Sequence, residues 1–125
     1  MADRKRILIA DDDPDLVDLL KLDLTNQGYD ILVAMNGKEA LQMAMGEKVD
    51  LVLLDVMMPY IDGYHVAYEV TSKLGSGAPL IILMTSRDTT REKGIAIMSG
   101  AAEVLQKPFE MESLHKKIAE ILSRS

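Results

Sequence analysis

Residues 51–55 read LVLLD and residues 7–13 read ILIADDD, so that two short apolar runs each end in aspartate. Apolar runs of this length are typical of strands buried on both faces of a parallel sheet. In such sheets, ligands bind just beyond the carboxyl ends of the strands. We therefore expect Asp11, Asp12 and Asp55 to share one crevice at that edge of the sheet.

Short apolar runs alternate with segments of helical periodicity five times along the chain. This alternation predicts an α/β fold, with a single doubly wound sheet of five parallel strands and five helices on its two faces. Strands are expected near residues 7–10, 30–35, 51–55, 80–84 and 103–106. Helices are expected between Pro14 and Gly28, Asn36 and Gly46, Tyr64 and Leu74, Thr89 and Gly100, and Met111 and Leu122.

Polar residues at the expected helix starts agree with these boundaries. Asp13-Pro14 has the form of an N-cap followed by proline at the first helical position. Asn36 with Glu39, and Thr89 with Glu92, have the spacing of a capping box. Along the helix after Thr89, the apolar stripe expected to face the core consists of Ile95, Ala96, Met98 and Ala101.

The composition favours a small soluble protein inside the cell. A chain of 125 residues is sufficient for one domain, which we expect to span residues 1–125. The net charge of −6 argues against direct nucleic-acid binding, which requires a basic face. There are no cysteines, and no apolar run approaches the ~18 residues of a membrane span. We therefore expect a cytoplasmic protein without membrane insertion.

The expected carboxylate crevice has the residues needed for phosphoryl chemistry. Crowded carboxylates need a cation, and their hard oxygen atoms suit Mg²⁺. Thr85 ends the fourth expected strand and Lys107 ends the fifth, so a hydroxyl and an ammonium group should join the same edge. An aspartate can act as nucleophile in phosphoryl transfer, with a metal ion, a lysine and hydroxyl donors neutralising oxygen charge.

Taken singly, most of these polar residues also have ordinary structural explanations. Thr85 could be a strand-end residue and Lys107 an exposed loop lysine, whereas Asp13 is explained by its capping role. Met57 and Met58 suit packing better than chemistry. The two histidines are expected at the surface, because their spacing does not match a metal site; they are His65 and His115.

The whole chain resembles a receiver domain of the two-component response-regulator family, similar to single-domain chemotaxis-type or phosphorelay proteins. The matching segments are residues 7–14, 50–59, Asp62-Gly63, 84–86 and Lys107-Pro108-Phe109. The resemblance implies a flavodoxin-like parallel sheet with the strand order 2-1-3-4-5.

The resemblance also implies a role for each residue at the strand ends. Asp55 would accept the phosphoryl group from a phosphohistidine of a sensor histidine kinase or histidine phosphotransfer protein. Mg²⁺ (or Mn²⁺) would be held directly by Asp12, Asp55 and the backbone carbonyl of Met57, with Asp11 as a second-sphere or water-mediated ligand. Thr85 and Lys107 would contact phosphoryl oxygens, and the Lys107-Pro108 peptide bond would be cis. Such a domain is no conventional enzyme, because it catalyses only its own aspartyl phosphorylation and dephosphorylation.

The chain departs from the usual family pattern at several positions. Val104 stands where many members have an aromatic residue that reports phosphorylation, and Tyr60 replaces a common glycine, placing its ring near the site or on a partner surface. Only Glu103 remains of an acidic pair found in members that dimerise through the last helices and strand. Neither Met57 nor Arg87 can orient water as an amide could, which predicts a long-lived phosphorylated form.

Two alternatives remain open from the sequence. A haloacid-dehalogenase-type phosphohydrolase would also use a strand-end aspartate, a hydroxyl residue, a lysine and magnesium, although Val56-Met57 replaces its usual second aspartate. A receiver with a vestigial site would act only as an interaction module. The cognate kinase, the output, and whether the chain is a complete protein or part of a longer one are not determined by the sequence.

Overall fold

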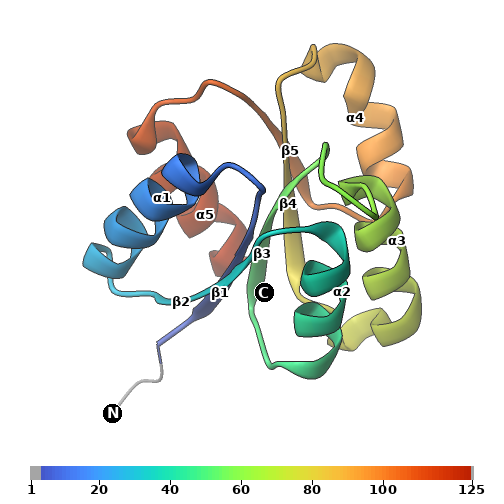
Figure 1. Cartoon of the computed structure of the whole chain (residues 1–125), viewed down its shortest axis with the longest axis horizontal. Helices are drawn as coiled ribbons and strands as arrows, with labels where there is room; N and C mark the ends of the chain where they lie inside the picture. The colour runs from blue at the N-terminus through green and yellow to red at the C-terminus, as the bar shows by residue number, and fades with distance from the viewer. Residues whose placement is uncertain (1–3, 125) are drawn as a thin grey trace.

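The computed structural model describes residues 4–124, except for the side chain of Thr89. The expected domain also includes residues 1–3 and 125, which lie outside the described residues. Five parallel strands form one sheet in the order β2-β1-β3-β4-β5 (Figure 1). The strands are β1 (Arg6–Ala10), β2 (Asp30–Ala34), β3 (Leu51–Asp55), β4 (Leu80–Thr85) and β5 (Glu103–Gln106). The predicted fold class is therefore confirmed.

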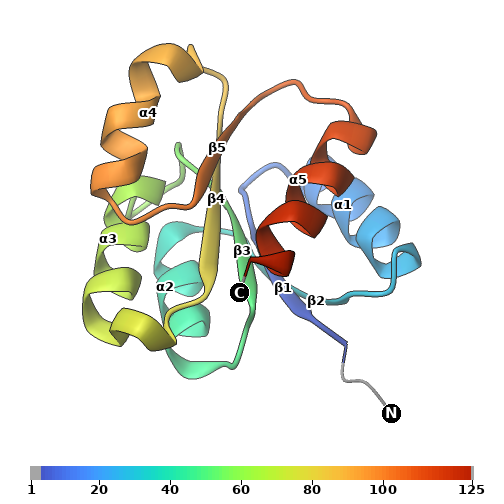
Figure 2. The ribbon, with the colours of Figure 1, turned by 180° about the vertical axis from the view of Figure 1, so that it is seen from behind.

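Five α-helices connect or follow these strands. They are α1 (Pro14–Asn26), α2 (Gly37–Gly46), α3 (Gly63–Leu74), α4 (Thr89–Met98) and α5 (Met111–Ser123), with a short 3₁₀ turn, η1 (Gly75–Gly77), after α3. Helices α1 and α5 cover one face of the sheet, and α2, α3 and α4 cover the other (Figures 1 and 2). None of the helices in this part of the chain has the length and hydropathy needed to cross a bilayer.

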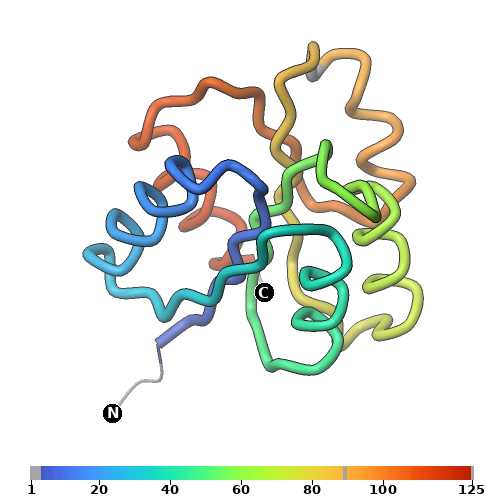
Figure 3. The backbone as a smooth tube through the Cα atoms, in the orientation of Figure 1, coloured from blue at the N-terminus to red at the C-terminus, as the bar shows by residue number. Residues whose placement is uncertain are grey.

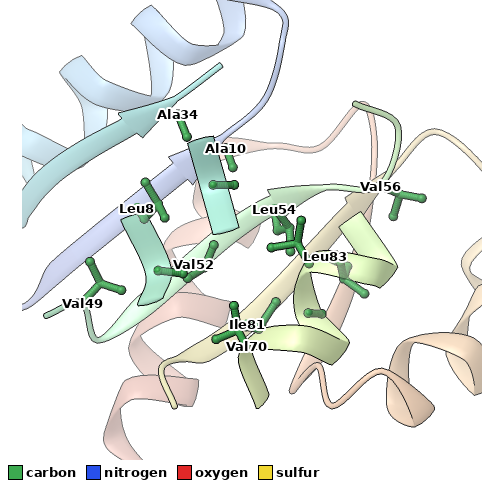
Figure 4. Close-up of a cluster of buried hydrophobic side chains, with 14 of the residues drawn as sticks. Leu8, Ala10, Ala34, Val49, Val52, Leu54, Val56, Val70, Ile81 and Leu83 are labelled. Atoms are coloured by element: carbon green, nitrogen blue, oxygen red, sulfur yellow. The ribbon is translucent and has the colours of Figure 1, made fainter. Parts of the chain in front are cut away.

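The side chains of β3 alternate between the two faces, which explains why the whole strand is apolar. Val52 and Leu54 belong to the cluster beneath α2 and α3 (Figure 4), and Leu51 and Leu53 belong to the cluster beneath α1 and α5. All four side chains are buried. Because successive strand residues point to opposite faces, a strand covered on both sides needs apolar residues at every position.

Two of the three predicted N-caps are confirmed by their side-chain contacts. The Asp13 side chain accepts hydrogen bonds from the backbone N–H groups of Asp15 and Leu16, and Pro14 is the first residue of α1. The Asn36 side chain caps α2 by accepting a bond from the N–H of Glu39. These contacts satisfy backbone donors that have no partner inside a helix.

Helix α4 begins at Thr89 as expected, but the predicted capping box of Thr89 and Glu92 is wrong. Asp88 is the N-cap, and its side chain accepts a hydrogen bond from the N–H of Thr90. Glu92 is buried and pairs with a side chain outside the helix, as described below. The predicted inner stripe is also partly wrong, because Ile95 and Met98 are exposed. The position of the Glu92 side chain is therefore explained by its ion pair with Arg87, not by a capping box.

Loops at the carboxyl edge of the sheet bring distant parts of the chain together (Figure 3). Glycine is needed at two close approaches in this region. A Cβ atom on Gly63 would lie 2.4 Å from the carbonyl oxygen of Asp55, and one on Gly37 would lie 1.8 Å from that of Ile61. The starts of α2 and α3 are thus packed directly against the backbone that surrounds Asp55.

Candidate functional site

Three carboxylates meet at the carboxyl edge of the sheet. Asp11 directly follows β1 and is 1% exposed, and Asp55 ends β3 and is 6% exposed. Asp12 is exposed, yet one oxygen atom from each of the three side chains lies within 4.8 Å of the others. The predicted grouping of Asp11, Asp12 and Asp55 is therefore present in the fold.

Lys107 bridges the two buried carboxylates from the end of β5. Its Nζ atom lies 2.6 Å from Oδ2 of Asp11 and 3.3 Å from Oδ1 of Asp55. The Lys107-Pro108 peptide bond is cis, as the resemblance implied. The alternative in which Lys107 is an exposed loop residue is excluded, because 21% of its side chain is exposed and its ammonium group points into the carboxylate cluster.

The charges at this site are unequally compensated. Burial, and then the charge of Asp11, raise the pKa of Asp55 to about 6, although Lys107 and a backbone hydrogen bond from Met57 act in the opposite direction. Burial also disfavours the charge on Lys107, but its hydrogen bond to Asp11 and the nearby Asp55 raise the pKa of Lys107 above its ordinary value. The charge of the Asp55 carboxylate is therefore only partly neutralised by its neighbours.

Thr85 occupies the end of β4 next to this group. Its side chain is fully buried, and its Oγ1 atom accepts a hydrogen bond of 3.0 Å from the backbone N–H of Arg87. Its carbonyl oxygen accepts a bond of 2.7 Å from the N–H of Lys107. Backbone contacts thus fix the relative positions of Thr85 and Lys107 at adjacent strand ends.

The donor set fits a small divalent cation. Carboxylate oxygens are the ligands that Mg²⁺ prefers, and Mg²⁺ usually takes one or two of them together with water. Asp11 and Asp55 are buried and oriented, whereas Asp12 reaches the same position from the exposed side. The position of the Met57 carbonyl as a further ligand remains a prediction from the resemblance.

The side chain of Met57 differs from its sequence-based interpretation. It is 56% exposed, so packing does not explain it. Its Sδ atom lies 3.6 Å from Nη2 of Arg87. Nη1 of Arg87 in turn lies 3.5 Å from Oε1 of Glu92 on α4. Sequence reasoning missed this connection, although a glutamate on an otherwise apolar or small helical face is a signal for a buried partner.

Four other positions singled out in the sequence have a defined environment in the structure. Val104 is buried in the cluster beneath α4. Tyr60 has a φ of 73° and is 83% exposed, so its ring projects away from the protein. His115 lies at the surface as expected but is only partly exposed, because its ring contacts the Asp23 carboxylate across α5 and α1 at 2.5 Å. The ring of His65 is exposed, as predicted.

Residues 7–119 match the family model of the response regulator receiver domain. The chain therefore belongs to the family of response regulator receiver domains, which are parts of two-component signalling systems.

Among curated proteins, two regulators of Bacillus subtilis (strain 168) are similar to it. The uncharacterized transcriptional regulatory protein YrkP is 39% identical over 95% of this chain and 50% of its own length. The alkaline phosphatase synthesis transcriptional regulatory protein PhoP is 36% identical over 97% of this chain and 50% of its own length. The chain thus spans about half the length of these relatives.

Solved structures have the same fold and retain clear sequence similarity. A CheY-like receiver domain protein from Methanospirillum hungatei has a TM-score of 0.90 and 30% identity, covering 98% of this chain and 96% of its own. The response regulator TrrA from Thermotoga maritima, in complex with Mg²⁺ and BeF, has a TM-score of 0.83 and 38% identity, covering 93% and 97%. That relative is thus known with bound Mg²⁺, and the cluster of Asp11, Asp12 and Asp55 in this chain is of a kind that could hold a metal ion.

Proposed function

We propose that Asp55 accepts a phosphoryl group from a phosphohistidine of a sensor histidine kinase or histidine phosphotransfer protein. The observation that carries the proposal is the bridging of Asp11 and Asp55 by Lys107, beside the buried hydroxyl of Thr85. In this proposal, residues 1–125 act as one cytoplasmic receiver domain without membrane insertion. Their net charge of −6 supports signalling through proteins rather than direct contact with nucleic acid.

The proposed transfer uses Asp55 as the nucleophile. With a pKa of about 6, the group is mostly ionised near pH ~7, so a carboxylate oxygen is available. This oxygen forms the new P–O bond while the P–N bond to the donor imidazole breaks, and the imidazole nitrogen keeps the electron pair. Lys107 pairs with one phosphoryl oxygen, and the Thr85 hydroxyl donates a hydrogen bond to another.

Asp11, Asp12, Asp55 and the backbone carbonyl of Met57 would hold Mg²⁺ or Mn²⁺. When bound, the ion supplies positive charge next to the phosphoryl oxygens. Asp11 and Asp55 are fixed by burial and by Lys107, so these carboxylates need little rearrangement to serve as ligands. Hydrolysis of the acyl phosphate would return Asp55 to its free form, and the domain would catalyse no reaction beyond this cycle.

Radiolabelled acetyl phosphate with Mg²⁺ tests the proposal directly. We expect one acid-labile phosphoryl group per chain and no labelling of Asp55→Asn. Asp62→Asn is a matched control, because Asp62 is an exposed aspartate that caps α3 and asparagine retains this capping ability. Labelling that persists in Asp55→Asn would contradict the proposal, and steady turnover of a phosphomonoester would favour the phosphohydrolase instead.

A further inference from the structure

Helix α4 is held to the domain by an unusual set of side chains. Among the side chains of α4 that the structure describes, Glu92 and Ala96 are buried, and Ser99 is buried just beyond the helix. The larger apolar side chains of Ile95, Ile97 and Met98 are 50%, 72% and 83% exposed. Because α4 buries little apolar surface, the contacts of the Glu92 carboxylate are important for its position.

The Glu92 carboxylate is incompletely compensated. It is 5% exposed, and its Oε1 atom lies 3.5 Å from Nη1 of Arg87, an ion-pair distance without hydrogen-bond geometry. Within residues 4–124, neither Glu92 Oε1 nor the buried Tyr64 hydroxyl has a hydrogen bond of regular geometry, although the two groups lie close enough to interact. Burial and the neighbouring Glu92 raise the pKa of Tyr64 to about 12. Arg87 is therefore the cation paired with this buried carboxylate, which also lies beside the Tyr64 hydroxyl.

Arg87 also contacts the rim of the candidate phosphorylation site in two ways. Its Nη2 atom lies 3.6 Å from Sδ of Met57, two residues after Asp55. Its backbone N–H donates a 3.0 Å hydrogen bond to Oγ1 of Thr85. A single residue thus contacts the loop after Asp55, the hydroxyl of Thr85 and the buried carboxylate of α4.

The guanidinium group of Arg87 has room to move. An open hollow of about 510 Å³ is lined by Arg87, Asp88, Arg91 and Glu92, and 59% of the Arg87 side chain is exposed. A phosphoryl group carries a charge of about −1.5 to −2 at neutral pH, and a guanidinium group binds its oxygens in a bidentate manner. A phosphoryl group on Asp55 would therefore compete with Glu92 for Arg87.

We propose that Arg87 detects the phosphoryl group on Asp55 and that Glu92 is the positioning residue that holds Arg87 beforehand. The inference rests on the function proposed above. When Arg87 turns to the phosphoryl oxygens, Glu92 remains buried without a cation, and the first turns of α4 loosen. The signal reaches α4 because Arg87 exchanges one anionic partner, Glu92, for another, the phosphoryl group. This route needs no aromatic side chain at position 104.

Hydrogen exchange with and without Mg²⁺ and beryllofluoride tests this coupling. Bound beryllofluoride is detected independently by fluorine NMR, and α1 (Pro14–Asn26) serves as an internal reference. In the parent chain, we expect the α4 amides to exchange roughly fivefold faster when beryllofluoride binds, because the buried Glu92 carboxylate loses its ion-pair partner. In Arg87→Gln, α4 exchange should be fast in both states, since Glu92 is never neutralised.

Glu92→Gln should have the opposite signature, with slow α4 exchange in both states, because a neutral amide needs no cation. A purely structural role would instead accelerate exchange in both variants. Arg91→Gln is the matched control, because Arg91 is an exposed arginine in the same part of α4, and it should respond like the parent chain.

The possible failures are distinguishable. If beryllofluoride does not bind to the parent chain, the proposed function fails and this inference fails with it. If it binds and α4 of Arg87→Gln still responds as in the parent, only the role of Arg87 is refuted. A response that is lost equally in Arg91→Gln would also overturn the inference, because it would reflect the general charge of α4.

Discussion

Lys107 lies closer to Asp11 than to Asp55, at 2.6 Å from an oxygen of the first and 3.3 Å from an oxygen of the second. The same ammonium group is thus shared unequally between two buried carboxylates. Asp55, which receives the weaker share, has a pKa raised to about 6 by burial and by Asp11. Near neutral pH, the carboxylate of Asp55, the proposed nucleophile, is therefore ionised, and its negative charge is only weakly balanced by Lys107.

Replacing Lys107 with methionine should destabilise the fold. Lys107→Met leaves two buried carboxylates without their cation, and removing one partner from such a group costs about 2 kcal/mol or more. Urea denaturation in EDTA measures this loss. Lys116→Met on the exposed side of α5 is the control, with an expected change within about 0.5 kcal/mol. An equal effect of the two substitutions would contradict the bridging role.

Asp55→Asn should stabilise the protein in a pH-dependent manner. The pKa of Asp55 is raised from 3.8 to about 6, so its protonated form favours the folded state, and this contribution is lost as the pH rises through about 6. Relative to the parent, the variant should gain on the order of 2 kcal/mol near pH ~7 and little near pH ~4. Denaturation series in EDTA across this range measure the difference. A gain independent of pH would rule out the titration of Asp55 as its cause.

Asp12 and Asp13 should respond differently to Mg²⁺. Asp12 is exposed and belongs to the carboxylate cluster, whereas Asp13 caps α1. At Mg²⁺ concentrations about 100-fold above Kd, binding should stabilise the parent by about 2.7 kcal/mol. Asp12→Asn should lose most of this increment with little change in EDTA, and Asp13→Asn should retain it, because asparagine also caps helices. Thermal unfolding with and without Mg²⁺ distinguishes the two, and equal increments would argue against Asp12 as a ligand.

A methyl group at Gly63 should displace the backbone of Asp55. The new Cβ atom would lie 2.4 Å from the Asp55 carbonyl oxygen, so Gly63→Ala should cost about 1–3 kcal/mol and perturb the NMR signals of the site. Gly94→Ala on α4 is the control, because its Cβ atom would meet no atom within 4 Å. This second change should stabilise the helix by about 1 kcal/mol. A harmless Gly63→Ala would mean that α3 can move away from β3.

Met57→Asn should shorten the lifetime of the acyl phosphate. The methionine side chain is exposed at the site and cannot hold a water molecule, whereas an amide can both donate and accept hydrogen bonds. The decay of labelled phosphoprotein measures the lifetime. Met57→Leu also removes the sulfur contact with Arg87 but adds no amide, so its lifetime should match the parent. Equal decay of both variants would show that water access does not depend on residue 57.

The sequence predicted the strands well because burial on both faces requires continuous apolar runs, as in residues 51–54. It also grouped Asp11, Asp55 and Lys107 correctly, and placed Thr85 at the strand end adjacent to Lys107, because parallel strands have their carboxyl ends at one edge. The distances within this group, and the preference of Lys107 for Asp11, depend on side-chain packing that no local pattern encodes.

Helix α4 shows where local pattern reasoning failed. The inner face of α4 has Glu92, Ala96 and Ser99 at helical spacing, which is a small and polar face. A hydrophobic pattern therefore selected the neighbouring face with Ile95 and Met98, which is exposed. The face with Glu92 packs inward, where Glu92 forms an ion pair with Arg87. Because Arg87 lies outside the helix, the periodicity of α4 alone does not reveal this contact.

The two-sided burial of the sheet has a consequence for how this domain can diverge in evolution. Leu53 and Leu54 are neighbours in sequence but pack in separate clusters on opposite faces. Substitutions in side chains that share no partners change stability almost independently. Either layer of helices can therefore accumulate substitutions with little effect on the packing of the other layer.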